Sequence, residues 1–333
     1  MADLGIVRSH SVQELQQALS SREMADYVRC CEAQFMRQTA ELAYQVAWDP
    51  ELRAIFIAGP SSSGKTTFNE RLSSALHMHG RPTCNLSLDD YYRDALVPDW
   101  IDGRPDLESL GTLDVELMSE HIARLLEGET VDVPRFDFMT RRRVYEPGRQ
   151  LRMPPRGILL VEGLHGLAPE VVQDLPRSSY RRILIMPYAQ LVDEGQKELL
   201  GPREIRMLRR LCRDSRHRNT SPLVTLDYWP MLDYSEQTML PLYIQEADDF
   251  VNSAMGYEFC VMPHLAEALV EQDLELHRQG QLGKPAFLPA GQDFAQLDLA
   301  LAEAEKILKI ARRLPSVDPE IVPPNSILNE FIH

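Results

Sequence analysis

The sequence lacks the features that mark membrane, secreted or nucleic-acid-binding proteins. No apolar run in its 333 residues approaches the about 20 residues that a membrane-spanning helix needs. Its first residues, Met-Ala-Asp-Leu-Gly, do not have the charged and apolar character of a secretory signal. Basic residues are outnumbered, 35 against 50 acidic ones, which gives a net charge of −15. We therefore expect neither nucleic acid nor an anionic membrane surface as a partner.

Cysteine and lysine are also scarce. The five cysteines (Cys30, Cys31, Cys84, Cys212 and Cys260) have no metal-ligand spacing, and adjacent Cys30 and Cys31 are poor disulfide partners. A reduced, cytoplasmic protein is the simplest expectation. Because only five of the 35 basic residues are lysines, we judge the arginines by their spacing and not by their number.

The most informative segment is Gly-Pro-Ser-Ser-Ser-Gly-Lys-Thr at residues 59–66, which has the phosphate-binding pattern G-x-x-x-x-G-K-[ST]. Residues 53–58 before it form an apolar run typical of a buried strand, and residues 67–79 after it have apolar side chains on one helical face. In this context the N–H groups of the loop and the helix dipole hold phosphates. The alternative is a glycine turn that binds nothing.

The candidate nucleotide-binding residues all belong to this loop and the turn after it: Gly59, Ser61, Ser62, Ser63, Gly64, Lys65, Thr66 and Thr67. Lys65 would reach the outer phosphates as a point charge, and the Thr66 hydroxyl would bind Mg²⁺.

The pattern of elements predicts an α/β fold of the P-loop NTPase type, with a parallel sheet covered by helices on both faces. The expected strands are 53–58, 83–88, 157–161, 182–186 and, with the weakest pattern, 257–262. Residues 93–112 and 130–156 are rich in Pro, Gly, Asp and Arg and are expected to be functional loops.

Three parts are expected along the chain. Residues 1–50 would form a helical N-terminal extension, with helices at 12–19 and 23–46, and residues 51–263 the core. Residues 264–333 would form a helical C-terminal extension packed on the core, with helices at 264–280 and 292–314. The final segment, 321–333, is too apolar for a free terminus and is expected to dock on the core.

Acidic residues follow two of the expected strands, where the site of an open α/β sheet lies. Glu162 would help to hold Mg²⁺, directly or through water, or would only cap the next turn. Asp89 is the candidate general base, because its strand is expected to neighbour the strand of the phosphate loop. The alternative for Asp89 and Asp90 is a pair of helix caps. His165 lies near the site or only packs there.

Arginines recur every three or four residues on one predicted helix face, at Arg203, Arg206, Arg210 and Arg213. Arg209 and Arg216 would lie on another face, and Arg218 follows in a polar stretch. Such a stripe is usually a solvated surface. Here it follows the Asp-Glu-Gly-Gln-Lys segment, which is expected to be flexible, so we interpret residues 195–222 as a mobile lid that brings arginines to phosphoryl charge.

Together these segments resemble the uridine kinase and phosphoribulokinase family of P-loop kinases. The matching segments are 59–67, 87–92, 134–143, 159–167 and 208–220. Residues 225–230, 245–254 and 323–332 are similar to a bacterial uridine kinase-like branch of that family. Members of that branch often carry an N-terminal TGS-type domain, and this chain begins after the position where that domain would end.

The resemblance implies ATP-dependent phosphorylation of a nucleoside 5′-hydroxyl, with Mg²⁺. It assigns catalytic roles to the base Asp89, the phosphate-loop Lys65 and the lid arginines Arg213 and Arg218, and metal binding to Thr66 and Glu162. On the acceptor side it assigns Tyr92, Glu108 and Arg210. Two acceptor positions depart from the uridine–cytidine kinases: Phe136 replaces a tyrosine and Arg141 replaces a histidine.

These departures leave the acceptor open. A sugar, polyol or phosphosugar is the second candidate class, because a lost or gained polar contact shifts specificity strongly. A regulatory protein that binds ATP without turnover is the third possibility, although such a protein would not need Asp89. The expected partners are therefore ATP and a small hydroxyl-bearing acceptor, and a homo-oligomer stays open.

Overall fold

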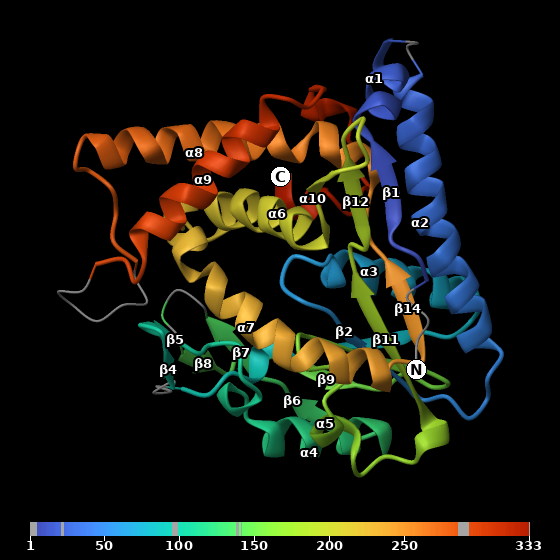
Figure 1. The fold of residues 1–333 in the computed structure, drawn as a ribbon. Coiled ribbons are helices and arrows are strands. Elements are labelled where there is room, and N and C mark those ends of the chain that lie inside the picture. Colours follow the sequence, from blue (N-terminus) through green and yellow to red (C-terminus); the bar gives the residue numbers. More distant parts are fainter. Residues whose placement is uncertain are drawn as a thin grey trace.

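The computed structural model describes residues 5–20, 23–94, 99–137, 140, 142–285 and 293–332. Its centre is a five-stranded parallel sheet (Figure 1), formed by β2 (Ala54–Ala58), β3 (Thr83–Ser87), β10 (Ile158–Glu162), β11 (Tyr180–Met186) and β14 (Asp249–Asn252). The strand order is β14-β11-β2-β10-β3, so the strand that leads into the phosphate loop is central.

Helices cover both faces of the sheet, because alternate residues of a strand point to opposite sides. Ile55 and Ile57 pack on one side in a core shared with α2 (Met24–Ala47) and α3 (Lys65–Met78). Phe56 packs on the other side, in a core shared with α4 (Val115–Leu126) and α5 (Pro169–Val172). Burial on both faces explains the continuous apolar runs of the strands. The predicted α/β P-loop fold is confirmed.

The fifth strand lies elsewhere than the sequence predicted. Residues Gly256–Cys260 form the 3₁₀ helix η4, and the edge strand is β14. The side chains of η4 are fully buried, and periodicity alone cannot distinguish a short buried apolar run from a strand. The true strand was obscured by its polar ends: Asp249 accepts hydrogen bonds from Arg181, and the Asn252 side chain accepts one from the backbone N–H of Tyr188.

A second, three-stranded sheet contains β1 (Arg8–Ser11), β12 (Ala189–Val192) and β13 (Glu198–Leu200), with β1 parallel and β13 antiparallel to β12. The segment expected to be a flexible lid linker is the turn of the β12–β13 hairpin. There the Asp193 carboxylate accepts the N–H groups of Gly195 and Lys197 at 2.9 and 3.0 Å. A hydrogen-bonded turn therefore precedes the arginine helix.

The two regions expected to be irregular loops contain regular elements. Residues 93–112 include the ribbon β4 (Trp100–Ile101) with β5 (Arg104–Pro105), and the 3₁₀ helix η2 (Leu110–Thr112). Residues 130–156 contain two antiparallel ribbons, β6 (Thr130–Asp132) with β9 (Gln150–Arg152), and β7 (Arg135–Asp137) with β8 (Arg142–Val144). These ribbons are too short for an alternating pattern to identify them.

The remaining described elements are helices. They are α1 (Val12–Ser20), α6 (Pro202–His217), α7 (Pro222–Glu246), α8 (Met262–Arg278), α9 (Leu297–Ala311) and α10 (Asn329–Ile332), besides the 3₁₀ helices η1 (Leu88–Tyr91), η3 (Arg177–Ser179) and η5 (Pro319–Ile321). Helices α6, α8, α9 and α10 pack together in one layer (Figure 1).

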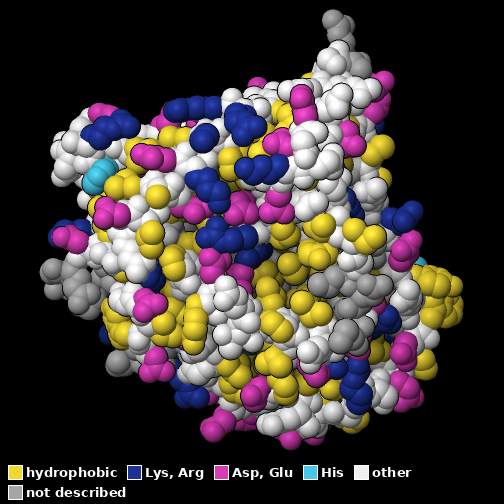
Figure 2. Space-filling view, viewed as in Figure 1, with side chains coloured by type: hydrophobic (Ala, Val, Ile, Leu, Met, Phe, Trp, Pro, Cys, Tyr) yellow, Lys and Arg dark blue, Asp and Glu magenta, His cyan; other side chains and the backbone are white. Residues whose placement is uncertain are grey.

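Helix α7 was not predicted. It contains Pro230 and Pro241, which normally end a helix, and its first half buries side chains on every side. Among the described helices, none is both long and apolar enough to cross a bilayer. On the face seen in Figure 2, acidic and basic side chains are interspersed and do not separate by sign.

Candidate active site

The phosphate-loop segment connects β2 to α3 at the carboxyl edge of the sheet. Glu162 is the last residue of β10, and Asp89 lies in η1 directly after β3. Parallel strands bring these three segments to one edge. We expected the strand before Asp89 to lie beside β2. This prediction is wrong, because β10 lies between the two strands. Glu162, and not Asp89, therefore ends the strand beside the phosphate loop.

Two positions in the loop have geometry that the sequence pattern anticipates. Gly64 has φ +89°, a left-handed conformation that glycine adopts without strain. A Cβ on Gly59 would lie 2.1 Å from the carbonyl oxygen of Ile185, so only glycine allows the loop to approach β11 this closely.

The polar groups of the loop suit an anion. The hydroxyls of Ser62 and Ser63 are buried and have no hydrogen-bond partner among the described residues. The Lys65 ammonium donates to the carbonyl oxygens of Gly59 and Pro60, at 2.9 and 3.3 Å. Hydroxyls, an ammonium group and a helix N-terminus thus converge on one spot, and this set fits a phosphate group.

Glu162 is a buried carboxyl group of the site with a raised pKa. Burial, and next the charge of Asp89, raise its pKa to about 7, while Lys65 opposes the shift. Its Oε1 accepts a hydrogen bond from the Ser87 hydroxyl at 2.8 Å, because Glu162 and Ser87 are opposite each other across β10 and β3. No described group donates a hydrogen bond to the Asp89 carboxylate, which is half-buried. The Asp89 carboxylate is therefore not engaged by another described side chain.

A cation is the simplest means of keeping Glu162 ionised beside Asp89. Thr66, at the start of α3, has an exposed side chain on the same edge of the sheet. Among the described residues, no group of three or more His, Cys, Asp or Glu side chains forms a metal site by itself. Mg²⁺ is commonly held by one or two protein groups together with substrate phosphates and water, so a Thr66–Glu162 pair fits it.

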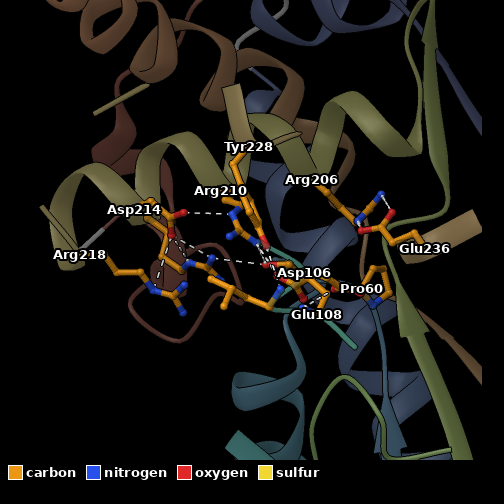
Figure 3. Close-up of polar contacts among 12 residues, drawn as sticks. Pro60, Asp106, Glu108, Arg206, Arg210, Asp214, Arg218, Tyr228 and Glu236 are labelled. Carbon is orange, nitrogen blue, oxygen red and sulfur yellow. Dashed lines mark hydrogen bonds and ion pairs between the residues drawn. The ribbon is translucent and has the colours of Figure 1, made fainter. Parts of the chain in front are cut away.

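An arginine cluster on α6 faces the phosphate loop (Figure 3). Arg210, Arg213 and Arg218 surround the Asp214 carboxylate, with N–O distances of 3.0, 2.9 and 3.7 Å. Arg210 and Arg213 also donate to the Ser61 hydroxyl, at 2.7 and 3.4 Å. Burial alone would raise the pKa of Asp214, but the three guanidinium charges hold that pKa below its ordinary value. Asp214 thus fixes three cations beside the loop.

The other two arginines of the predicted stripe, Arg203 and Arg206, form ion pairs within the protein. The stripe is therefore not a solvated surface. Arg206 lies in a buried pair with Glu236 and is turned away from Asp214 in Figure 3. Arg203 binds Asp233 at 2.9 Å. Within the described part of the chain, neither side chain contacts the phosphate loop.

Arg209, expected on a different face, is fully buried behind the loop. Its guanidinium binds Glu258 at 2.7 and 2.9 Å and the carbonyl oxygen of Ser253 at 2.8 Å. A longer contact, 3.5 Å, reaches the carbonyl oxygen of Ser62. Helical spacing placed Arg209 correctly off the main stripe but could not reveal that it supports the phosphate loop.

The predicted acceptor-side residues lie close to one another. The Arg210 guanidinium is 4.0 Å from the Glu108 carboxylate. The rings of Tyr92 and Phe136 are 5.2 Å apart. Burial, followed by the charges of Asp89 and Glu108, raises the pKa of Tyr92, which shows that Tyr92 is near both acids. Arg141 lies outside the described residues.

Two residues that the sequence left ambiguous have structural roles. Asp90 accepts the backbone N–H of Phe136 at 3.1 Å and a bond from Arg149 at 2.5 Å, so it anchors the β7–β8 ribbon. His165 donates from Nε2 to the carbonyl oxygen of Glu108 at 2.9 Å, and its Nδ1 accepts from the Tyr243 hydroxyl at 2.9 Å. Burial lowers the pKa of His165 to about 4, so this imidazole is neutral.

Tyr228 of α7 is a residue that sequence reasoning missed. Its hydroxyl donates to the carbonyl oxygen of Pro105 at 3.0 Å and accepts the Leu107 N–H at 3.3 Å. It therefore positions the chain just before Glu108. The match at residues 225–230 covers Tyr228, but it did not reveal this role, because α7 itself was not predicted.

The fold and the loop define the chain as an α/β P-loop protein. The family model described as "Phosphoribulokinase / Uridine kinase family" matches residues 54–179. Over this segment the chain is similar to the phosphoribulokinase and uridine kinase family of P-loop kinases.

Curated relatives include uridine kinases at low identity. The uridine kinase of Deinococcus deserti is 26% identical over 211 residues, which cover 63% of this chain and 86% of that protein. The uridine kinase of Ligilactobacillus salivarius is 25% identical over 221 residues, 66% of this chain and 89% of that protein. A solved structure described as a possible uridine kinase from Bacillus stearothermophilus has 19% identity and a TM-score of 0.38, covering 60% of this chain and 89% of its own.

Proposed function

We propose that this protein is an ATP- and Mg²⁺-dependent small-molecule kinase whose leading acceptor is a nucleoside 5′-hydroxyl. The observation that carries the proposal is the meeting of three elements at one sheet edge. These are a phosphate-binding loop, the Asp89 carboxylate with no described donor, and the arginine cluster held by Asp214. A protein that only binds nucleotide would need the phosphate-binding loop but not a free base.

In this proposal the loop residues 59–67 bind the phosphates of ATP, and Lys65 places its charge on the outer phosphates. Mg²⁺, held by Thr66 and Glu162, would neutralise charge on the phosphates. Asp89 takes the proton of the acceptor hydroxyl as that hydroxyl attacks the γ-phosphorus in line. Arg213 and Arg218 stabilise the charge that spreads over the transferred group.

On the acceptor side we propose that Tyr92, Phe136 and Arg210 enclose the acceptor and that Glu108 binds its hydroxyls. Arg141 would set the specificity, because it adds a fixed charge and five donors where the uridine–cytidine kinases have a histidine. A sugar, polyol or phosphosugar is the alternative acceptor that this charge favours. We also propose the division into a core at 51–263, with a lid near 195–222, and two helical extensions.

The direct test is product formation. Purified protein, ATP and Mg²⁺ are incubated with a panel of nucleosides, sugars and polyols, and phosphorylated products are detected by mass. A product with a nucleoside supports the leading acceptor, and a product with a sugar or polyol supports the alternative. ATP binding without any product across the panel would favour the regulatory reading.

The Asp89→Asn variant tests the assigned base. We expect it to bind ATP normally and to lose about 10²–10⁴-fold in kcat, the usual contribution of a general base. The matched control is Asp174→Asn, at an exposed position, which should leave kcat unchanged. Near-normal turnover by Asp89→Asn on the true acceptor would show that Asp89 is not the base.

A further inference from the structure

The C-terminal segment of the chain reaches the phosphate loop. The Glu330 carboxylate, on α10, accepts a hydrogen bond from the backbone N–H of Thr67 at 3.3 Å and another from the Thr67 hydroxyl at 3.0 Å. Thr67 is the third residue of α3, so its N–H has no acceptor within the helix. One oxygen of Glu330 thus occupies the donors that the phosphate-binding pattern offers to an anion.

The segment around Glu330 is held independently of this contact. The Ile327 side chain covers Gly64, where an added Cβ would lie 2.3 Å from Ile327 Cδ1. The Arg209 guanidinium lies over the Phe331 ring, 5.1 Å from its centroid. Arg216 donates to the carbonyl oxygen of Ile332. The segment therefore stays in place beside the loop even when the Glu330 carboxylate is released.

The contact is electrostatically coupled to the rest of the site. The charge of Glu330 contributes to raising the pKa of Glu162. Its side chain is only half-buried, while its neighbours Phe331 and Ile332 are buried. A half-buried side chain can turn away while the buried neighbours hold the backbone. A phosphate bound at Thr67 would meet a like charge and compete for the same two donors.

We propose that Glu330 is an internal competitor of the nucleotide phosphates, and that nucleotide binding displaces its carboxylate from Thr67. The C-terminal segment is then part of the nucleotide site and lowers its affinity for phosphate-bearing ligands. This inference rests on the proposed function, because it requires that the loop binds nucleotide.

The experiment compares wild type, Glu330→Gln and the control Glu320→Gln by calorimetry with two probes, ATP with Mg²⁺ and inorganic tripolyphosphate. Glu320 is an exposed carboxylate of the same C-terminal segment, and among the described residues its side chain makes no contact with the loop. We expect Glu330→Gln to bind both probes about three- to tenfold more tightly, because a charged competitor becomes neutral. Glu320→Gln should match wild type.

Hydrogen exchange of the wild-type backbone at residues 326–332 gives a second measurement that does not depend on a variant. ATP should not slow exchange at these residues, because the buried neighbours hold the backbone while only the Glu330 side chain turns away. Slower exchange with ATP would mean that the segment closes on the nucleotide, and it would overturn the proposal. If Glu330→Gln bound ATP more tightly but tripolyphosphate no more tightly, that result would also overturn the proposal. Tripolyphosphate carries no nucleoside, so it tests the phosphate contact by itself.

The outcomes separate this inference from the proposed function. If wild type binds ATP, Lys65→Ala does not, and Glu330→Gln equals wild type, the competition is disproved while the kinase proposal stands. If no form of the protein binds ATP, both are overturned.

Discussion

Burial gives similar charged residues of this site different roles. Glu162 is buried near Asp89, and burial followed by the charge of Asp89 raises its pKa to about 7. The half-buried Asp89 carboxylate accepts no hydrogen bond from a described group. Asp214 is surrounded by three arginines, which keep its pKa low, and its carboxylate holds their guanidinium groups in place. The sequence shows three acids, but their surroundings differ, and on the proposed function they serve as metal ligand, base and anchor.

Lys65 provides the clearest test at the residue scale. We expect Lys65→Ala to weaken ATP binding and to lower turnover, because it removes the charge on the outer phosphates and touches no core side chain. Calorimetry with ATP and Mg²⁺, followed by steady-state kinetics, measures both effects. The matched control is Lys197→Ala, at an exposed position of the β12–β13 hairpin. Unchanged affinity and rate in Lys65→Ala would contradict the phosphate-loop assignment.

At the scale of elements, neighbouring arginines of α6 contact the phosphate loop and the core. Arg210 and Arg213 face the phosphate loop, while Arg206 and Arg209 form buried ion pairs with Glu236 and Glu258. A buried pair does not guarantee added stability, but removing one partner leaves a buried charge unpaired. These pairs hold the helix in the core next to the two arginines that face the phosphate loop.

Glu258→Gln tests this fixing of α6. Since Arg209 is fully buried and Glu258 is 2% exposed, we expect a loss of about 3–5 kcal/mol in the free energy of unfolding. Chemical denaturation measures the loss. The exposed Glu275, which pairs with Arg278, provides the control, and Glu275→Gln should leave the unfolding midpoint unchanged. Equal midpoints for the two variants would mean that Arg209 is satisfied without its partner.

At the scale of the whole molecule, His165 joins three separate parts of the chain. It follows β10, donates to the segment of Glu108, and accepts from Tyr243 of α7. Burial keeps it neutral, with its pKa lowered from 6.5 to about 4. The unfolded chain therefore binds more protons than the folded one between these two values. The stability that the neutral imidazole contributes is complete above pH 6.5 and is lost as the pH falls toward 4.

We expect this group to account for up to about 3 kcal/mol of the acid-induced loss of stability. Urea denaturation of wild type and His165→Gln at several pH values between 4 and 7 measures it, since glutamine retains a donor for the carbonyl oxygen of Glu108. The slope of the free energy of unfolding against pH should be smaller in His165→Gln than in wild type. His79→Gln, at an exposed histidine, should keep the wild-type slope. Identical slopes in all three proteins would contradict the assignment of His165.

The sequence by itself determined the α/β class, four of the five strands and the strand–loop–helix unit around Lys65, because these depend on local apolar runs and on one short pattern. It also indicated Asp89 and Glu162, since the ends of parallel strands share an edge. Only the tertiary structure decided that Glu162 and not Asp89 ends the strand beside the loop, because strand order follows from packing. Only the folded chain brings Glu330 to Thr67, 263 residues away, since no local pattern encodes a contact of that separation.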